Sequence, residues 1–181
     1  MRNVIAIIGP SGSGKTYLAN QIRERHLLHF EWDGCQVISF ADSLKDCAKE
    51  FLDYSEDDKE QQRQKLIDLG FALKEIDDQA IIRAMVRRIN FGNQLFVVPD
   101  VRFREEVEFL NKTFSTQFVL IYDPNQLEYQ PGGFISSPER LSRDLVRLHN
   151  NGEKLPSWIK RVIKNDKNSS LSEIADELLL N

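Results

Sequence analysis

Residues 9–16 have the types and the spacing needed to bind a polyphosphate. They read Gly-Pro-Ser-Gly-Ser-Gly-Lys-Thr, which fits the pattern G-x-x-x-x-G-K-[ST]. Glycine lets successive backbone N–H groups approach phosphate oxygens without a Cβ in the way. Lys15 adds a positive charge for the outer phosphates, and the Thr16 hydroxyl suits Mg²⁺. The pattern therefore predicts an ATP-binding loop, with an ordinary glycine-rich turn as the alternative. The residues expected to bind ATP here are Gly9, Ser11, Gly12, Ser13, Gly14, Lys15, Thr16 and Tyr17.

Acidic and basic side chains follow a second apolar run. Residues 95–98 read Leu-Phe-Val-Val, and Asp100 and Arg102 come soon after them. In phosphate-loop enzymes an acid at the end of such a strand helps to hold Mg²⁺, and arginine can bind a phosphate through its planar guanidinium group. We therefore expect Asp100 and Thr16 to hold the metal, and Asp100 and Arg102 to act in catalysis beside Lys15. The alternative for Asp100 is a helix cap.

Arginines gather on one face of a helix expected over residues 139–149. At about 100° per residue, Arg140, Arg143 and Arg147 fall within roughly 60° of one another. The segment before them is rich in Pro, Gly, Ser and Gln, which predicts an irregular connection. We therefore expect a lid over about residues 123–147, in which Arg140 and Arg143 contact the transferred phosphoryl group. The alternative is an ordinary solvated helix face.

The elements that must position these residues alternate along the chain. Apolar runs predict strands, whereas apolar residues three and four apart predict helices, one of them broken at Gly70. Ser43-x-x-Asp46 and Ser170-x-x-Glu173 have the spacing of helix capping boxes. This order predicts a three-layer α/β fold, with a mostly parallel five-stranded sheet covered by helices on both faces and ligands at the carboxyl ends of its strands. The expected strands are residues 3–8, 36–40, 95–98, 117–122 and a part of 158–164.

A helical insert over about residues 43–95 is expected to bind a second substrate. Arg63 and Lys74 lie in it, and each could bind an acceptor phosphate or be a plain surface charge. Asp42 stands just before the insert, where it could cap a helix or face a substrate. Together with Arg102, these three are the candidate acceptor-binding residues.

Composition excludes several classes of protein. The chain has 181 residues and a net charge of −4, which fits a single domain over residues 1–181 and argues against a nucleic-acid-binding surface. Its apolar runs fall short of the ~20 residues that a membrane helix needs, and a strand at the start of the chain argues against a secretory signal. Two cysteines, Cys35 and Cys47, lack the spacing of a metal site. We expect a cytoplasmic protein.

Several stretches, met in order along the chain, share a family pattern. They are residues 37–45 (VISFADSLK), 100–103 (DVRF), 137–139 (SPE) and 162–166 (VIKND). With the phosphate-binding loop they make the chain resemble the bacteriophage deoxynucleoside monophosphate kinase family over nearly its whole length. This resemblance implies a P-loop kinase fold with a lid and an insert for the nucleoside monophosphate. It implies transfer of the γ-phosphoryl group of ATP to a deoxynucleoside monophosphate with the help of Mg²⁺. It also implies that Asn165 lies near the adenine of ATP, and that Asp42, Asp100 and Arg102 line the reaction centre.

Other functions remain open from the residues alone. A P-loop kinase could instead phosphorylate phosphomevalonate or dephospho-coenzyme A. A regulatory module could bind ATP without transferring a phosphoryl group. A nucleic-acid-dependent ATPase is disfavoured by the acidic balance. The sequence leaves open whether the protein is a monomer or a homodimer.

Overall fold

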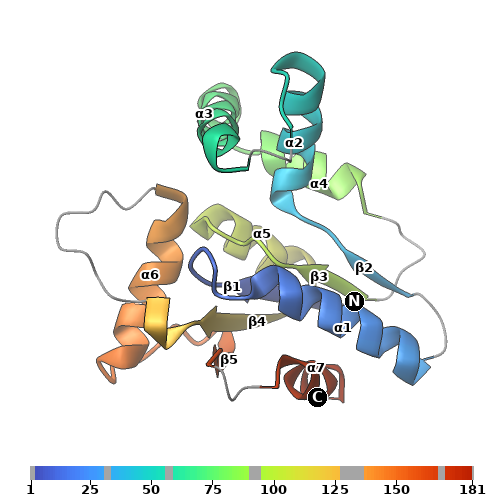
Figure 1. The fold of residues 1–181 in the computed structure, drawn as a ribbon, viewed down its shortest axis with the longest axis vertical. Helices are drawn as coiled ribbons and strands as arrows, with labels where there is room; N and C mark the ends of the chain where they lie inside the picture. Colours follow the sequence, from blue (N-terminus) through green and yellow to red (C-terminus); the bar gives the residue numbers. More distant parts are fainter. Residues whose placement is uncertain are drawn as a thin grey trace. The chain divides into compact units, whose positions relative to one another are not determined.

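The computed structural model describes residues 3–30, 34–55, 59–89, 95–126, 137–166 and 170–180. The chain divides into two compact units, which are Met1–Val37 with Phe91–Asn181, and Ile38–Asn90 (Figure 1). Within the described ranges, every helix is too short or too polar to cross a bilayer.

A parallel sheet of five strands organises the first unit. The strand order is β2-β3-β1-β4-β5, so β1 is central and pairs with β3 on one side and β4 on the other. Both faces of the central strands are buried, which explains their continuous apolar sequence. The predicted α/β fold is confirmed. The strands are β1 (Asn3–Ile8), β2 (Cys35–Val37), β3 (Leu95–Val98), β4 (Ser115–Tyr122) and β5 (Ile159–Lys164).

Helices cover both faces of this sheet. On one face, α1 (Lys15–Phe30) and α7 (Leu171–Leu180) lie side by side and share an apolar core with alternate strand residues such as Val97. The neighbouring Phe96 therefore points to the other face, where its ring contacts Phe114 at the end of α5. The helices α5 (Arg104–Thr113) and α6 (Ser137–Asn150) both contact β4, and a short 3-10 helix, η2 (Pro124–Gln126), follows that strand.

The second unit consists of three packed helices within its described part. They are α2 (Phe40–Phe51), α3 (Lys59–Ile76) and α4 (Ala80–Arg87), and each contacts the other two. The predicted break at Gly70 is wrong, because α3 continues through this residue. A Cβ at Gly70 would lie 3.5 Å from Leu44 Cδ1, so the glycine lies where α2 packs against α3. The helical stretch ends instead after Ile76, which is 84% exposed although its spacing predicts a buried face.

The start of α2 also differs from the prediction. Ser39, not Ser43, is the N-cap residue: its Oγ accepts a hydrogen bond from Ala41 N at 3.1 Å. In return, Asp42 Oδ2 accepts one from Ser39 N at 3.0 Å, which completes a capping box. Asp46, assigned to a cap by its spacing, forms an ion pair with Arg88 instead. Consequently β2 stops short of the predicted end of its strand, because the chain turns into the helix four residues earlier than expected.

Candidate active site

The loop between β1 and α1 has a backbone that requires glycine. Gly12 has φ 77° and Gly14 has φ 94°, both in the left-handed region that side chains disfavour. Ser13 N donates to Pro10 O at 3.3 Å, and Leu18 N donates to Gly14 O at 2.9 Å, which starts the helix directly after the loop. The backbone N–H groups of the loop therefore lie next to the N-terminus of α1. The helix dipole also favours an anion at this position.

Two glycines of this loop also touch the ends of the neighbouring strands. A Cβ at Gly9 would lie 2.2 Å from Ile121 O in β4. A Cβ at Gly14 would lie 2.6 Å from the side-chain Nδ2 of Asn165, which directly follows β5. Neither position leaves room for a side chain, so the loop lies tightly against the carboxyl ends of these strands.

The residues of the loop fit a polyphosphate. Lys15 Nζ donates to Pro10 O at 2.5 Å, which holds the positive charge across the loop. Ser13 is 1% exposed, and its Oγ has no hydrogen-bond partner among the described residues. Buried hydroxyl groups rarely lack a partner. The loop thus combines left-handed glycines, the ammonium group of Lys15 and the Ser13 hydroxyl group. This combination is suited to an anion with many oxygens.

A cavity of about 420 Å³ opens beside the loop, and its volume is typical of a small-molecule site. Tyr17, which is 59% exposed, lines it from α1, and Asn165 lines it from the end of β5. Its lining residues are Gly14, Tyr17, Asn165, Ser170, Leu171 and Ser172. The resemblance implied adenine near Asn165, and the structure brings Asn165 and Tyr17 together at one cavity.

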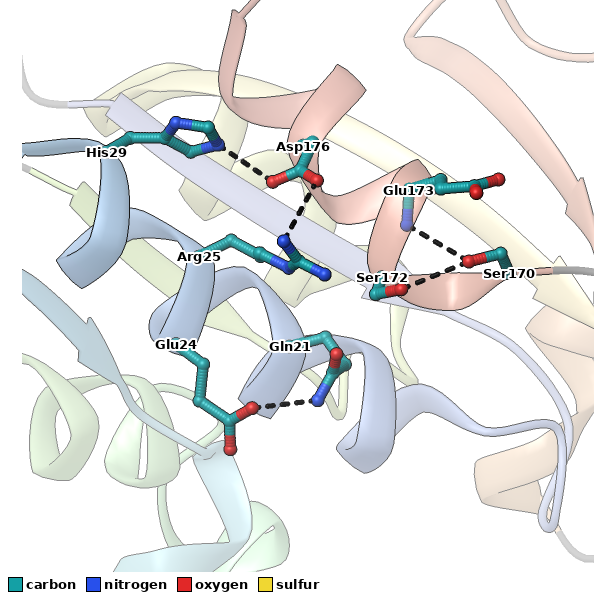
Figure 2. Close-up of polar contacts among 8 residues, drawn as sticks. All are labelled: Gln21, Glu24, Arg25, His29, Ser170, Ser172, Glu173 and Asp176. Carbon is teal, nitrogen blue, oxygen red and sulfur yellow. Dashed lines mark hydrogen bonds and ion pairs between the residues drawn. The ribbon is translucent and has the colours of Figure 1, made fainter.

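The start of α7 lines another side of this cavity. Polar contacts hold this helix both at its start and further along its length (Figure 2). Ser170 Oγ accepts from Glu173 N at 3.4 Å, as its spacing predicts, and lies 3.0 Å from Ser172 Oγ. Further along, Asp176 of α7 contacts Arg25 at 3.5 Å and His29 at 2.8 Å, both on α1. The helices that carry the two walls are thus joined to each other by polar contacts as well as by the core.

Asp100 and Arg102 lie in the turn that follows β3. Asp100 is 9% exposed, and Arg102 is half-buried. The turn is held by Glu106, whose Oε2 accepts from Arg102 N at 2.7 Å and from Phe103 N at 3.1 Å. The N-cap position of α5 is Phe103, so Asp100 is not the N-cap residue of this helix. Sequence reasoning missed Glu106, although a glutamate three residues after a helix start is a recognisable capping signal.

The three arginines of α6 differ in their surroundings. Arg140 and Arg147 are exposed, whereas Arg143 is half-buried and pairs with Glu139 at 3.3 Å. The Nε of Arg143 is buried without a hydrogen-bond partner in the described part of the chain. Glu139 is only 9% exposed, so a buried carboxylate fixes this one guanidinium group. Residues 127–136 of the predicted lid lie outside the described residues.

The candidate acceptor-binding residues of the second unit lie on two helices. Asp42 belongs to the capping box of α2. Arg63 and Lys74 are half-buried on α3. Among the described residues, no group of three or more His, Cys, Asp or Glu side chains could hold a metal ion.

Comparison with known proteins decides the family. The family model described as phosphomevalonate kinase matches residues 7–116, which is more than half of the chain. The chain belongs to the phosphomevalonate kinase family. Its matched part holds the phosphate-binding loop, the second unit, and the turn with Asp100 and Arg102. No curated protein matches the chain at a significant level.

One solved kinase structure supports this fold, and two others are similar at lower TM-scores. The shikimate kinase from Acinetobacter baumannii in complex with shikimate has a TM-score of 0.53 and 17% identity, over 99% of this chain and 91% of that one. The Mycobacterium tuberculosis APS kinase in complex with AMPPNP and APS has a TM-score of 0.47 and 18% identity, over 98% and 95% of the two chains. A shikimate kinase from Bacteroides thetaiotaomicron has a TM-score of 0.48 and 14% identity, over 100% of both chains. By family and fold, the protein is a P-loop kinase.

Proposed function

We propose that this protein transfers the γ-phosphoryl group of ATP to the phosphate of a small phosphomonoester, and that the acceptor is a deoxynucleoside monophosphate. The observation that carries the proposal is the loop over residues 9–16. Its left-handed glycines, the packing of Gly9 and Gly14 against the strand ends, and the Lys15 ammonium group suit a nucleoside triphosphate.

The reaction joins two anions, so the task of the protein is to align them and to neutralise their charge. An oxygen of the acceptor phosphate attacks the γ-phosphorus, and the bond from that phosphorus to the β,γ-bridging oxygen breaks to release ADP. The attacking phosphate is already anionic at neutral pH, so the mechanism needs no strong general base. Lys15 would neutralise charge that moves toward the bridging oxygen.

The residues present also fit a magnesium ion. Thr16 stands at the first turn of α1 and offers a hydroxyl, and Asp100 offers a carboxylate after β3. A site with few protein ligands suits Mg²⁺, which commonly keeps waters and binds substrate phosphates. Bound there, Mg²⁺ would withdraw negative charge from the phosphate oxygens. The arginines of α6 would add further charge, and Arg143 is the best held of them.

For the acceptor we propose four residues: Asp42, Arg63 and Lys74 of the second unit, and Arg102 after β3. The arginines and Lys74 would bind the acceptor phosphate. Asp42 Oδ2 accepts from Ser39 N in the capping box, so a contact with the substrate would use its other oxygen. Chemically, cations of this kind favour a phosphomonoester over a neutral alcohol, because a phosphate carries the negative charge that they bind.

Two acceptors share this chemistry. The resemblance to the bacteriophage family extends past residue 116, to the start of α6 and to residues 162–166 after it, and this favours a deoxynucleoside monophosphate. The family model favours phosphomevalonate as the second candidate. Either product would be a diphosphate ester formed by the same transfer.

A substrate panel separates these candidates. Release of ADP is measured with each of the four deoxynucleoside monophosphates, with phosphomevalonate and with dephospho-coenzyme A. We expect one or more deoxynucleotides to give the highest kcat/KM. Highest turnover with phosphomevalonate would replace the first acceptor by the second. Tight ATP binding without transfer to any of them would indicate a regulatory ATP-binding module.

The loop itself is tested by Lys15→Ala, which should lower kcat by at least about 100-fold, as expected when a charge aimed at the transferred group is removed. Lys112→Ala, on the exposed surface of α5, is the matched control and should leave kcat unchanged.

Hydrolysis of ATP without an acceptor should be slow, because a kinase must keep water from the γ-phosphate. Equal ATP turnover with and without acceptor would contradict the proposed transfer.

A further inference from the structure

We infer that Asn165 is a positioning residue of the phosphate-binding loop, acting through its side-chain amide on the peptide between Ser13 and Gly14. The inference rests on the proposed binding of a nucleoside triphosphate, but it does not depend on which acceptor is used. It gives Asn165 a role beyond contact with a base, and it connects the loop to the end of β5.

Asn165 is held by its backbone and by its side chain. Its backbone N donates to Tyr122 O, the last residue of β4, at 2.8 Å. Its Nδ2 donates to Ser13 O at 3.0 Å, across 152 residues of sequence. A carbonyl can only accept, so this contact fixes which end of the amide faces the loop.

The amide also packs closely on the loop. Its Nδ2 lies 2.6 Å from the position that a Cβ of Gly14 would take. Gly14 has φ 94°, so both the backbone conformation and the contact with Asn165 require glycine at this position. The hydrogen bond and this packing together hold one peptide of the loop in a single orientation.

The orientation of that peptide decides where a phosphate-binding donor points. All peptide bonds of the described residues are trans. In a trans peptide the C=O and the N–H point in opposite directions. Because Ser13 O points to Asn165, the Gly14 N–H must point away from it. Asn165 would therefore aim the Gly14 N–H at a phosphate oxygen before the ligand arrives, which saves the cost of ordering the loop.

The test uses a ligand with no base. Inorganic triphosphate and ATP are titrated into the wild-type protein, Asn165→Ala and Asn165→Asp, with Asn111→Ala on the exposed surface of α5 as the matched control. We expect both variants at position 165 to bind inorganic triphosphate at least about tenfold more weakly, as expected when a hydrogen bond that orders a charged site is lost. The control should bind it like the wild type.

The aspartate variant keeps the size and shape of the side chain but replaces the donor by a negatively charged acceptor, so its weaker binding counts as support only when Asn165→Ala also binds more weakly. Wild-type affinity of Asn165→Asp for inorganic triphosphate would therefore overturn the inference. So would weaker ATP binding with unchanged triphosphate binding, because that result would mean that Asn165 contacts only the base.

A second readout addresses folding and local geometry. In ¹⁵N–¹H spectra, the Gly14 amide resonance should shift on addition of inorganic triphosphate in the wild type and much less in Asn165→Ala, while resonances of the sheet stay in place. An equal shift of the Gly14 resonance in both proteins would reject the inference. Because no acceptor is present, these results are independent of the substrate panel, which can fail while Asn165 keeps its role.

Discussion

At the scale of single residues, Gly9 and Gly152 lack a side chain for different physical reasons. Gly9 is held against the backbone of β4, where a Cβ would lie 2.2 Å from Ile121 O. Gly152 has φ 70° in the turn after α6, yet a Cβ there would meet nothing within 4 Å. The first position is limited by space and the second only by backbone conformation. The two glycines are therefore a matched pair for testing how the loop is built.

We expect Gly9→Ala to lower the free energy of unfolding by about 1–3 kcal/mol and to abolish measurable ATP binding, because a backbone carbonyl cannot move aside as a side chain can. Gly152→Ala should cost about 1 kcal/mol for its left-handed backbone and leave ATP binding intact. Urea unfolding and calorimetric titration measure the two effects. Unchanged ATP binding by Gly9→Ala would mean that the loop does not need its tight packing on β4.

At the scale of elements, the first turns of two helices position the candidate reacting groups. Glu106 closes the start of α5 and holds the backbone of Arg102, while being only 5% exposed. In the second unit, Ser39 and Asp42 close the start of α2 in a reciprocal pair. In both helices an acidic side chain near the N-terminus accepts hydrogen bonds from backbone N–H groups. It also interacts favourably with the positive end of the helix dipole.

We expect Glu106→Ala to lower the free energy of unfolding by about 2–3 kcal/mol, since two backbone donors lose a charged, buried acceptor. The same change should raise the KM of the acceptor, because Arg102 loses the contact that holds its backbone. Glu108→Ala, exposed on the same helix, should change stability by no more than about 0.5 kcal/mol. Equal unfolding curves for the two variants would show that the contact of Glu106 does not hold this turn.

Asp42 can be tested for a role beyond its cap. Ser39→Ala breaks the capping box from the other side and should cost about 1 kcal/mol of stability. If Asp42 also contacts the acceptor, Asp42→Ala should raise the KM of the acceptor at least about tenfold more than Ser39→Ala does. Initial rates at varied acceptor concentration give this comparison. The same KM in both variants would leave Asp42 with a capping role alone.

At the scale of the whole molecule, the sheet order brings distant segments to the phosphate-binding loop. β1 is central, so the loop after it lies beside the ends of β4 and β5, which the chain reaches only after more than a hundred residues. A ligand that binds such an assembled site stabilises the folded state as a whole.

At a concentration of about 100 Kd, ATP with Mg²⁺ should therefore raise the free energy of unfolding by about 2.7 kcal/mol. Thermal or urea unfolding with and without ATP measures this gain, and Lys15→Ala should lose most of it. Adenosine at the same concentration is the control without phosphates.

Removal of Mg²⁺ by excess chelator should reduce phosphoryl transfer to background. Full transfer in excess chelator would refute the assignment of Thr16 and Asp100 to a metal.

The sequence by itself determined the features that depend on neighbouring residues. β1 and β3 have the predicted bounds because their short apolar runs are bounded by glycine and by Pro99. The phosphate-binding loop was equally clear, because its glycines and its Lys15 act at fixed spacing within a single turn. The alternation of strands and helices then required a parallel sheet with helices on both faces.

Only the tertiary structure decided between patterns that the local sequence satisfies equally. Ser39-x-x-Asp42 and Ser43-x-x-Asp46 both fit a capping box, and the folded chain uses the first of them, directly after β2. The contact between Asn165 and Ser13 joins residues 152 positions apart, so nothing in the sequence near either one predicts it. Hydrogen bonds of this kind follow from how strands are ordered in the sheet, and strand order is set by the packing of the whole core rather than by any single segment.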